Sequence, residues 1–219
     1  MTLTALALAL STASAANYDP SAPITPADTK ACGERTEAEQ AAFTAELEAM
    51  YKAMTSDAKT AAKNGKEALK LERKGLLCTH DDRFWGAMVM LQTTEEEAAA
   101  RAYGLSKALV EARYPRGAWI AAVAYDRWAV AFGNLQSYGT QTRWDGAKQC
   151  LYWVDPNFSD EKRKAYGQPS LKQVIEKVLE ANGRAGDEPT VQRLQHLDLW
   201  CKPMPWDGSR NDLQDPYAR

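Results

Sequence analysis

The sequence predicts a mainly α-helical protein, either a single-domain helical bundle or a helix-hairpin stack, with one small β-hairpin near residues 138–154. Apolar residues recur at the three- and four-residue spacing of helices over most of the chain. Several of these stretches follow a Ser/Thr-x-x-Glu/Gln capping box, which marks a helix start. The helical period gives way around Asp145 and Gly146, where two short runs flank a turn signal.

The chain has 219 residues, of which 45% are hydrophobic, and this is enough to build a core. A net charge of -2 gives no reason to expect a nucleic acid or an anionic membrane as partner. We divide the chain into a signal peptide at residues 1–15, an extended linker at 16–31, a helical domain at 32–201 and a coil tail at 202–219.

The first 15 residues, MTLTALALALSTASA, have the composition of a secretory signal peptide. They are apolar and end in the small residues Ala13, Ser14 and Ala15, after which we expect cleavage. The segment is too short to cross a bilayer as a helix, so we expect no membrane insertion after cleavage. The mature chain is then periplasmic or secreted.

The cysteines agree with export, because they are even in number and widely spaced, as in disulfide-bonded proteins. They are Cys32, Cys78, Cys150 and Cys201. Four cysteines allow three connectivities. We favour Cys32–Cys78 with Cys150–Cys201, and the other two connectivities stay open.

Five helices are expected before residue 133. Thr36 and Glu39 form a capping box before the first, whose apolar face is Phe43, Leu47, Met50, Tyr51 and Met54. The second covers residues 57–73 and stops at Gly75. A third begins at Asp81 or Asp82 as N-cap, and its apolar face is Phe84, Trp85, Met88, Val89 and Leu91.

The fourth helix, residues 95–112, follows a capping box of Thr94 and Glu97. Glu97 also stands four residues before Arg101, a favourable spacing for an ion pair. Its buried face is expected to hold Ala98, Ala102, Leu105 and Leu109. Pro115 prevents the helix from continuing.

The next helix, residues 117–132, is apolar nearly all round, which is typical of a central, buried helix, and Gly133 ends it. Strands at 140–144 and 148–154 form the hairpin. A short helix at 159–166 follows. Further helices are expected at 171–182, after the capping box of Ser170 and Gln173, and at 190–200.

Asp126 and Arg127 stand inside the apolar helix, and a buried charge needs a partner. The polar box that follows can supply donors and acceptors through Gln136, Tyr138, Thr140, Gln141 and the loop backbone. In one interpretation this is a buried structural network. In the other it is a pocket, in which Arg127 binds an anion or carboxylate and Asp126 is an acid/base or orienting group.

Other candidates are weaker. His80 precedes Asp81 and Asp82 at a helix start, which could be a general base with its carboxylate but is more typical of a solvated helix start. His196 and Asp198 are similar. Four methionines, Met50, Met54, Met88 and Met90, are better explained by core packing than by copper. The sequence predicts no metal site and no cofactor.

The box resembles the signature of a family of uncharacterised bacterial proteins, A-x-x-x-D-R followed by G-x-x-Q-x-[YF]-G-T-Q. Here Ala121 or Ala122 precedes Asp126 and Arg127, and the second part is Gly133, Gln136, Tyr138, Gly139, Thr140 and Gln141. The resemblance covers somewhat under half of the chain. Members often carry Gln-His where this chain has Gln92 and Thr93. The resemblance implies a helical fold and no known activity.

Two functions follow as hypotheses. The first is an exported, non-catalytic binding or interaction protein, with an unidentified protein or small-molecule partner; an immunity or inhibitor protein is compatible with it. The alternative is a hydrolase whose candidate catalytic residues are Asp126 and Arg127, with Tyr138 and Gln141 beside them. A buried, internally satisfied network favours the first, and an open pocket favours the second.

Overall fold

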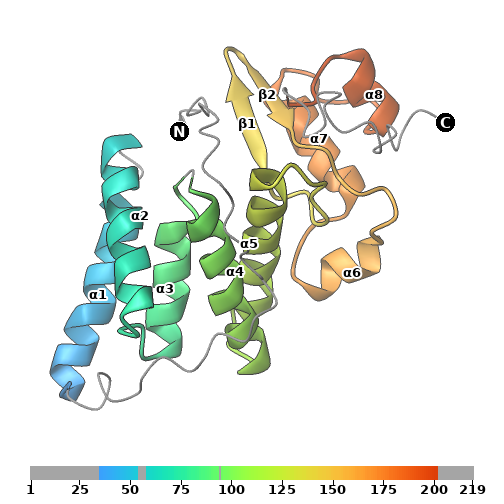
Figure 1. Cartoon of the computed structure of the whole chain (residues 1–219). Coiled ribbons are helices and arrows are strands. Elements are labelled where there is room, and N and C mark those ends of the chain that lie inside the picture. Colours follow the sequence, from blue (N-terminus) through green and yellow to red (C-terminus); the bar gives the residue numbers. More distant parts are fainter. Residues whose placement is uncertain (1–34, 54–57, 94, 202–219) are drawn as a thin grey trace. The chain divides into compact units, whose positions relative to one another are not determined.

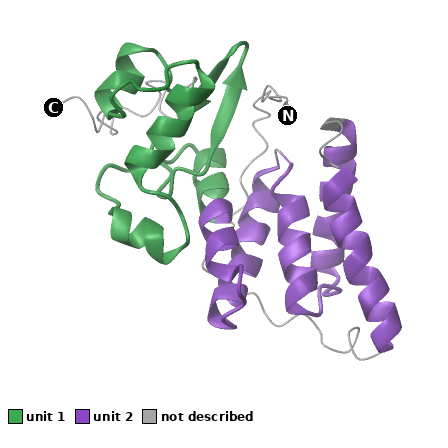
Figure 2. Ribbon diagram, turned by 180° about the vertical axis from the view of Figure 1, so that it is seen from behind, with its two compact units in different colours: residues 1–5, 125–219 green, residues 6–124 purple. Residues whose placement is uncertain are grey.

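The computed structural model describes residues 35–53, 58–93 and 95–201, and within them it has eight helices and one two-stranded antiparallel sheet (Figure 1). The prediction of a mainly α fold with one small hairpin is confirmed. The described residues divide into two compact units between Ala124 and Tyr125: the first ends at Ala124 (purple in Figure 2) and the second begins at Tyr125 (green). We describe each unit by itself, and the single helical domain over residues 32–201 stays a prediction.

The predicted signal peptide, linker and coil tail lie outside the described residues. Among the described residues, no helix is both long and apolar enough to cross a membrane.

Helix α3 is the centre of the first unit, because α1, α2 and α4 each pack against it. Its interior side chains include Phe84 and Met90, which are 1% and 0% exposed. The elements of this unit are α1 (Glu37–Ala53), α2 (Ala58–Arg73), α3 (His80–Met90), α4 (Glu96–Glu111) and the beginning of α5 (Gly117–Ala131). Met88 is also buried in this core, whereas Met50 is partly buried and Met54 lies outside the described residues.

The N-terminus of α1 has the predicted capping box. The Glu39 side chain accepts from the Thr36 amide at 2.7 Å, and the Glu39 amide donates to the Thr36 hydroxyl at 3.3 Å. For α3 the predicted cap is wrong, because Thr79 is the N-cap and Asp82 is the third helical residue of its capping box. In a capping box the N-cap hydroxyl accepts from the backbone N–H of the third helical residue, and the side chain of that residue accepts from the backbone N–H of the N-cap. Both residues therefore take part in the cap.

Asp82 is fully buried, and its carboxylate joins α1 to the start of α3. It accepts from the Gln40 amide at 2.7 Å and the Thr44 hydroxyl at 2.6 Å, both on α1. It also accepts from the backbone N–H groups of Cys78 and Thr79 at 3.0 and 3.1 Å. A buried carboxylate needs such donors, and here they fix the position of α1.

The start of α4 also differs from its prediction. Glu95 is the N-cap and has no side-chain cap bond, and Thr94 lies outside the described residues. Glu97 pairs with Arg73 of α2 at 2.5 Å instead of Arg101. Arg101 pairs with Glu72 at 3.4 Å. The helix packing brings α2 close enough to provide partners across the interface, which a spacing rule within one helix does not include.

The second unit begins inside α5 and continues through the hairpin. Gly133 has a positive φ of 72° and ends α5 as predicted. Strands β1 (Thr142–Asp145) and β2 (Lys148–Leu151) pair antiparallel, with Asp145 opposite Lys148, so that Gly146 and Ala147 form a two-residue turn. The helices that follow are α6 (Asp160–Ala165), α7 (Leu171–Ala181) and α8 (Val191–His196).

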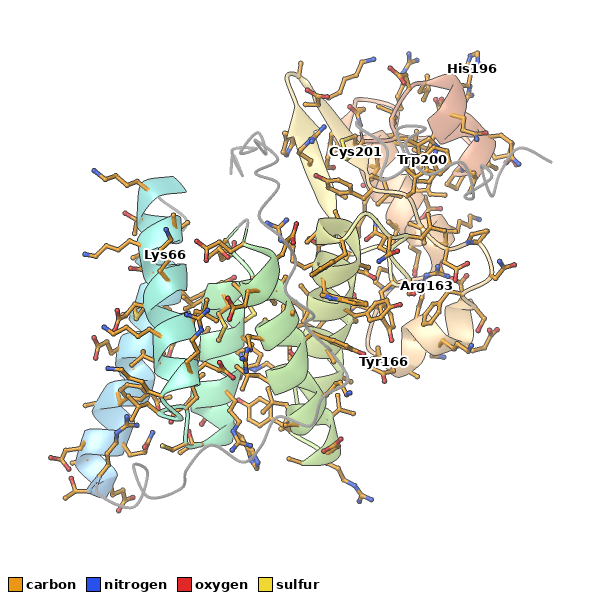
Figure 3. All side chains as sticks on the ribbon, in the orientation of Figure 1. Lys66, Arg163, Tyr166, His196, Trp200 and Cys201 are labelled. Carbon is orange, nitrogen blue, oxygen red and sulfur yellow. A yellow bond between two sulfur atoms is a disulfide. The ribbon has the colours of Figure 1, made fainter. Side chains whose placement is uncertain are left out.

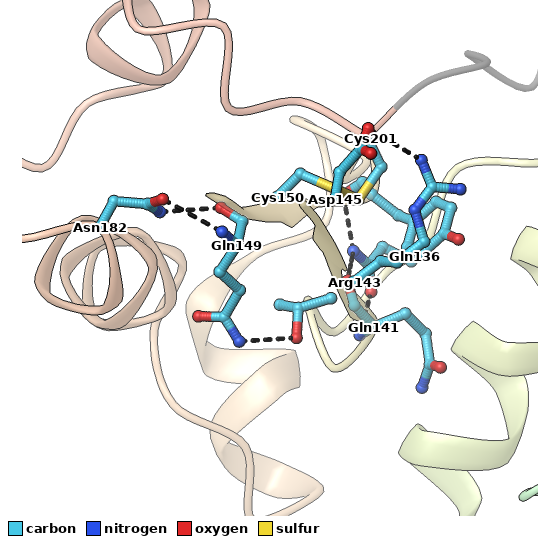
Figure 4. The surroundings of a disulfide bond; sticks show 10 residues. Gln136, Gln141, Arg143, Asp145, Gln149, Cys150, Asn182 and Cys201 are labelled. Atoms are coloured by element: carbon cyan, nitrogen blue, oxygen red, sulfur yellow. Dashed lines mark hydrogen bonds and ion pairs between the residues drawn. A yellow bond between two sulfur atoms is a disulfide. The ribbon is translucent and has the colours of Figure 1, made fainter. Parts of the chain in front are cut away.

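Helix α8 is shorter than predicted, because the chain turns at Asp198, which has a φ of 53°. Leu151 donates to the carbonyl of Leu199 and accepts from Cys201, each at 2.9 Å, so this segment lies along β2 rather than in a helix. A disulfide joins Cys150 to Cys201, as predicted (Figure 4). Burial of Leu199 and Cys201 explains why the helix stops early. Cys78 is disulfide-bonded, but its predicted partner Cys32 lies outside the described residues.

Helix α5 is not uniformly buried, which corrects the prediction of a central helix. Ile120 and Ala124 are fully buried, whereas Trp119 is 39% exposed. An all-apolar sequence predicts burial on every side, but the neighbouring elements cover only part of this helix.

We predict that Asp82→Asn lowers the free energy of unfolding by about 1–3 kcal/mol, because its amide group would face buried donors that now meet a carboxylate. Asp81→Asn is the matched control. Asp81 is exposed and accepts from the Tyr114 hydroxyl, so its loss should matter by less than about 1 kcal/mol. Urea denaturation of both variants measures the difference, and equal losses would contradict the role given to Asp82.

Candidate functional site

The carboxylate of Asp126 is the centre of the predicted box. It is 0% exposed and accepts from backbone N–H groups of the loop that follows α5: Ser137 at 2.7 Å, Tyr138 at 3.0 Å and Thr140 at 2.9 Å. The Thr140 hydroxyl donates to it as well, at 2.9 Å. The loop therefore closes around the carboxylate, and its donors occupy both oxygens.

Opposing effects act on the pKa of Asp126. Burial raises it, because the charged form loses hydration, and the hydrogen bonds from Tyr138, Thr140 and Ser137 lower it. Burial is the larger effect, so the pKa lies above its usual range. The Thr140 hydroxyl also accepts from the Gln141 side chain at 2.9 Å, which leaves its proton for Asp126.

Gln136 joins the loop to the beginning and the end of the hairpin. It is fully buried, and its side-chain oxygen accepts from the backbone N–H of Gln141 at 2.8 Å. Its side-chain nitrogen donates to the carbonyls of Gln141 at 3.1 Å and Tyr152 at 2.6 Å. The expectation that this amide would bind Asp126 or Arg127 is wrong, because its donors and acceptor are used by the hairpin backbone.

The Tyr138 ring packs into an aromatic cluster. Its centroid lies 4.8 Å from that of Phe158, 5.1 Å from that of Tyr166 and 6.0 Å from that of Tyr125. The backbone N–H of Tyr138 donates to Asp126. Tyr138 thus contributes a backbone donor to the box and aromatic packing around it.

Arg163 supports this cluster, and the sequence analysis missed it. It lies on α6 (Figure 3). It is 1% exposed and donates to the carbonyl of Phe158 at 2.5 Å and to the Asp160 side chain at 3.1 Å. Its guanidinium carbon lies 5.5 Å from the centroid of the Phe158 ring. In the sequence, Arg163 is one of several charged residues in a short polar helix, and nothing distinguishes it from a solvated side chain.

Arg127 follows Asp126 on α5. It is mostly buried. Burial lowers the pKa of its guanidinium, and the nearby Tyr152 opposes this shift. The effects that set the pKa of Asp126 are burial and the loop hydrogen bonds. The Asp126 carboxylate therefore keeps partners from its own loop without Arg127.

Gly139 allows the loop to close. Its φ is +77°, in the left-handed region, and a Cβ there would lie 3.2 Å from a methyl group of Val174 on α7. A side chain at this position would be strained by both effects. The glycine of the box is thus required by the turn and by the close approach of α7.

The weaker candidates do not form sites with the box. His80 and Asp81 are exposed at the start of α3, where the Tyr114 hydroxyl donates to Asp81, and Asp82 is buried in its own network. His196 is the last residue of α8 and is exposed. Within the described ranges, no group of three His, Cys, Asp or Glu side chains could hold a metal ion.

We predict that Asp126→Asn destabilises the protein by about 1–3 kcal/mol at neutral pH, because its amide nitrogen would face a loop donor. The free energy of unfolding of the wild type should rise further above that of the variant as the pH falls toward about 4, the ordinary pKa of Asp. The raised folded-state pKa means that the folded chain takes up a proton before the unfolded chain does. Its stabilising contribution is therefore present at low pH and lost as the pH rises.

Denaturant unfolding of the wild type and the Asp126→Asn variant at several pH values measures this. If the difference shrinks as the pH falls, the hydrogen bonds outweigh burial and the stated direction of the pKa is contradicted.

We predict that Gly139→Ala destabilises the protein more than Gly183→Ala does. Gly183 has a similar φ of +69°, but nothing lies within 4 Å of its added Cβ. The backbone term of about 1–2 kcal/mol is common to both variants. The contact with Val174 is specific to Gly139, so Val174→Ala in the Gly139→Ala background should recover part of the loss. Equal losses in thermal unfolding would contradict this close approach.

No match to the chain was found among protein-family models, curated proteins or solved structures. The resemblance of the box to a bacterial family therefore stays a prediction.

Proposed function

We propose that this protein is an exported, non-catalytic binding protein that acts through the surface of its helices. One observation carries the proposal: Asp126, the best candidate for a catalytic acid or base, is 0% exposed and surrounded by donors of its own loop. A catalytic carboxylate must come within hydrogen-bond reach of its substrate. Here Ser137, Tyr138 and Thr140 occupy that reach.

Export is supported by the predicted signal peptide and by the disulfide between Cys150 and Cys201. Disulfides persist in oxidising compartments such as the periplasm or the exterior of the cell. This bridge joins residues 51 apart in the sequence, and both cysteines are nearly or fully buried. The periplasm or the extracellular space is therefore the proposed location.

The proposal assigns a structural role to the box. Asp126 and Gln136 hold the loop and the hairpin, so their substitution would lower binding only through loss of folded protein. The hydrolase alternative gives Asp126 a direct role, in which turnover would be lost while the fold is kept.

We predict that the immobilised mature protein captures a partner from the exported fraction of its own cells, identified by mass spectrometry. We also predict no turnover of ester, phosphate or glycoside substrates.

Asp126→Asn should reduce capture only in proportion to the unfolded fraction, measured by circular dichroism in the same sample. A turnover activity that Asp126→Asn abolishes at unchanged melting temperature would overturn the proposed function.

A further inference from the structure

Helix α2 carries a straight stripe of positive charge. Its basic residues follow a four-three-four-three spacing, which places them within an arc of about 80° on the helix surface. All of them are exposed, and they are Lys59, Lys63, Lys66, Lys70 and Arg73. The stripe has about one cation per helical turn over a length of about 21 Å.

This stripe differs from the rest of the chain. Helix α2 has five basic and two acidic residues, whereas the whole protein has a net charge of -2. Like charges three or four positions apart destabilise a helix. Helix α7, in contrast, places Glu176 four residues after Lys172, so that its neighbours have opposite charge.

The charge on the stripe is only partly compensated. Lys66 pairs with Glu95 at 3.5 Å, Lys70 with Glu67 at 3.2 Å and Arg73 with Glu97 at 2.5 Å. Lys59 and Lys63 make no ion pair within the part of the chain that the structure describes. The first two turns of α2 therefore present positive charge to a partner.

A hollow of about 540 Å³ lies beside the stripe, between α1 and α2. Both helices pack against α3, and the Asn64 side chain donates to the carbonyl of Met50 at 3.0 Å. Met50 and Glu46 line the hollow from α1, whereas Lys63 and Lys70 line it from α2. The α2 wall also includes Lys66 and Glu67, so it carries three cations and one acid, whereas the α1 wall carries one acid beside an apolar side chain.

We propose that this α1–α2 face, defined by Glu46, Met50, Lys59, Lys63 and Lys70, binds an amphipathic helix of a partner protein. The partner helix carries an acidic stripe that lies along α2 and an apolar stripe beside it that enters the hollow at Met50. Helices with acids at three- and four-residue spacing match the cation spacing of α2. Glu46 disfavours a uniformly negative polymer, because such a ligand would meet this acid on the opposite wall.

The inference rests on the proposed binding function and names its surface and partner class. The test uses the full mature chain and a fluorescein-labelled peptide of about 18 residues, long enough for a helix of four turns. The peptide has Glu at four-three-four-three spacing and Leu on the adjacent stripe. Fluorescence anisotropy at about 20 mM and about 200 mM NaCl measures its dissociation constant.

We predict saturable binding that weakens with salt, and a loss of at least about tenfold in affinity for the Lys59→Glu, Lys63→Glu double variant. Met50→Lys should also weaken binding, because it places a charge in the apolar part of the hollow. The matched control is Lys172→Glu, Lys177→Glu, which changes the net charge equally at exposed positions of α7 and should bind as the wild type does. Circular dichroism checks that all variants fold.

Three outcomes would overturn the inference: no binding at low salt, equal binding of a scrambled peptide of the same composition, or equal loss in the α7 control. Equal binding of poly-L-glutamate would also overturn it, because the face would then select charge alone. If the partner captured from the exported fraction binds the Lys59→Glu, Lys63→Glu variant unchanged, this inference fails while the proposed function stands.

Discussion

The second unit depends on one buried carboxylate. Asp126 is fixed on a helix, and the chain that follows must bring the backbone N–H groups of Ser137, Tyr138 and Thr140 to it, because a buried charge without donors is strongly unfavourable. That requirement sets the path of the loop, which needs Gly139 at a positive φ. Gln136 then connects the same loop to both ends of the hairpin, and the disulfide holds the last described segment against β2.

The first unit also contains a buried carboxylate that accepts hydrogen bonds from backbone N–H groups. Asp82 is also fully buried, and it also gathers backbone N–H groups, those of Cys78 and Thr79, together with side chains of α1. In each unit a short acidic side chain replaces water as the partner of backbone amides, at the start of α3 for Asp82 and in the loop after α5 for Asp126. Both aspartates are thereby occupied within the fold. Exposed surfaces such as the basic stripe of α2 are therefore better candidates for binding a partner than the buried carboxylates are.

Local signals were sufficient to predict most of the elements. The capping boxes of Thr36 and Ser170 and the stop at Gly133 depend on residues close in sequence, and the structure has all three. The sequence offered the loop backbone and the Thr140 hydroxyl as donors to Asp126, and these do bind its carboxylate. Its individual contacts were not predictable, because several residues offer equivalent donors and only the folded backbone selects among them. The early end of α8 and the pairing of Arg101 with Glu72 likewise depend on contacts between distant segments.

The most direct test of this account is the hydrogen exchange of individual amides, measured by NMR in the folded protein. The amides of Ser137, Tyr138 and Thr140 lie in a loop, and loop amides ordinarily exchange fast. If they donate to the buried Asp126 carboxylate, they should exchange as slowly as the core amides of α7, such as Val178, and Asp126→Ala should accelerate them selectively. Fast exchange of these three amides in the wild type would contradict the claim that Asp126 organises the unit.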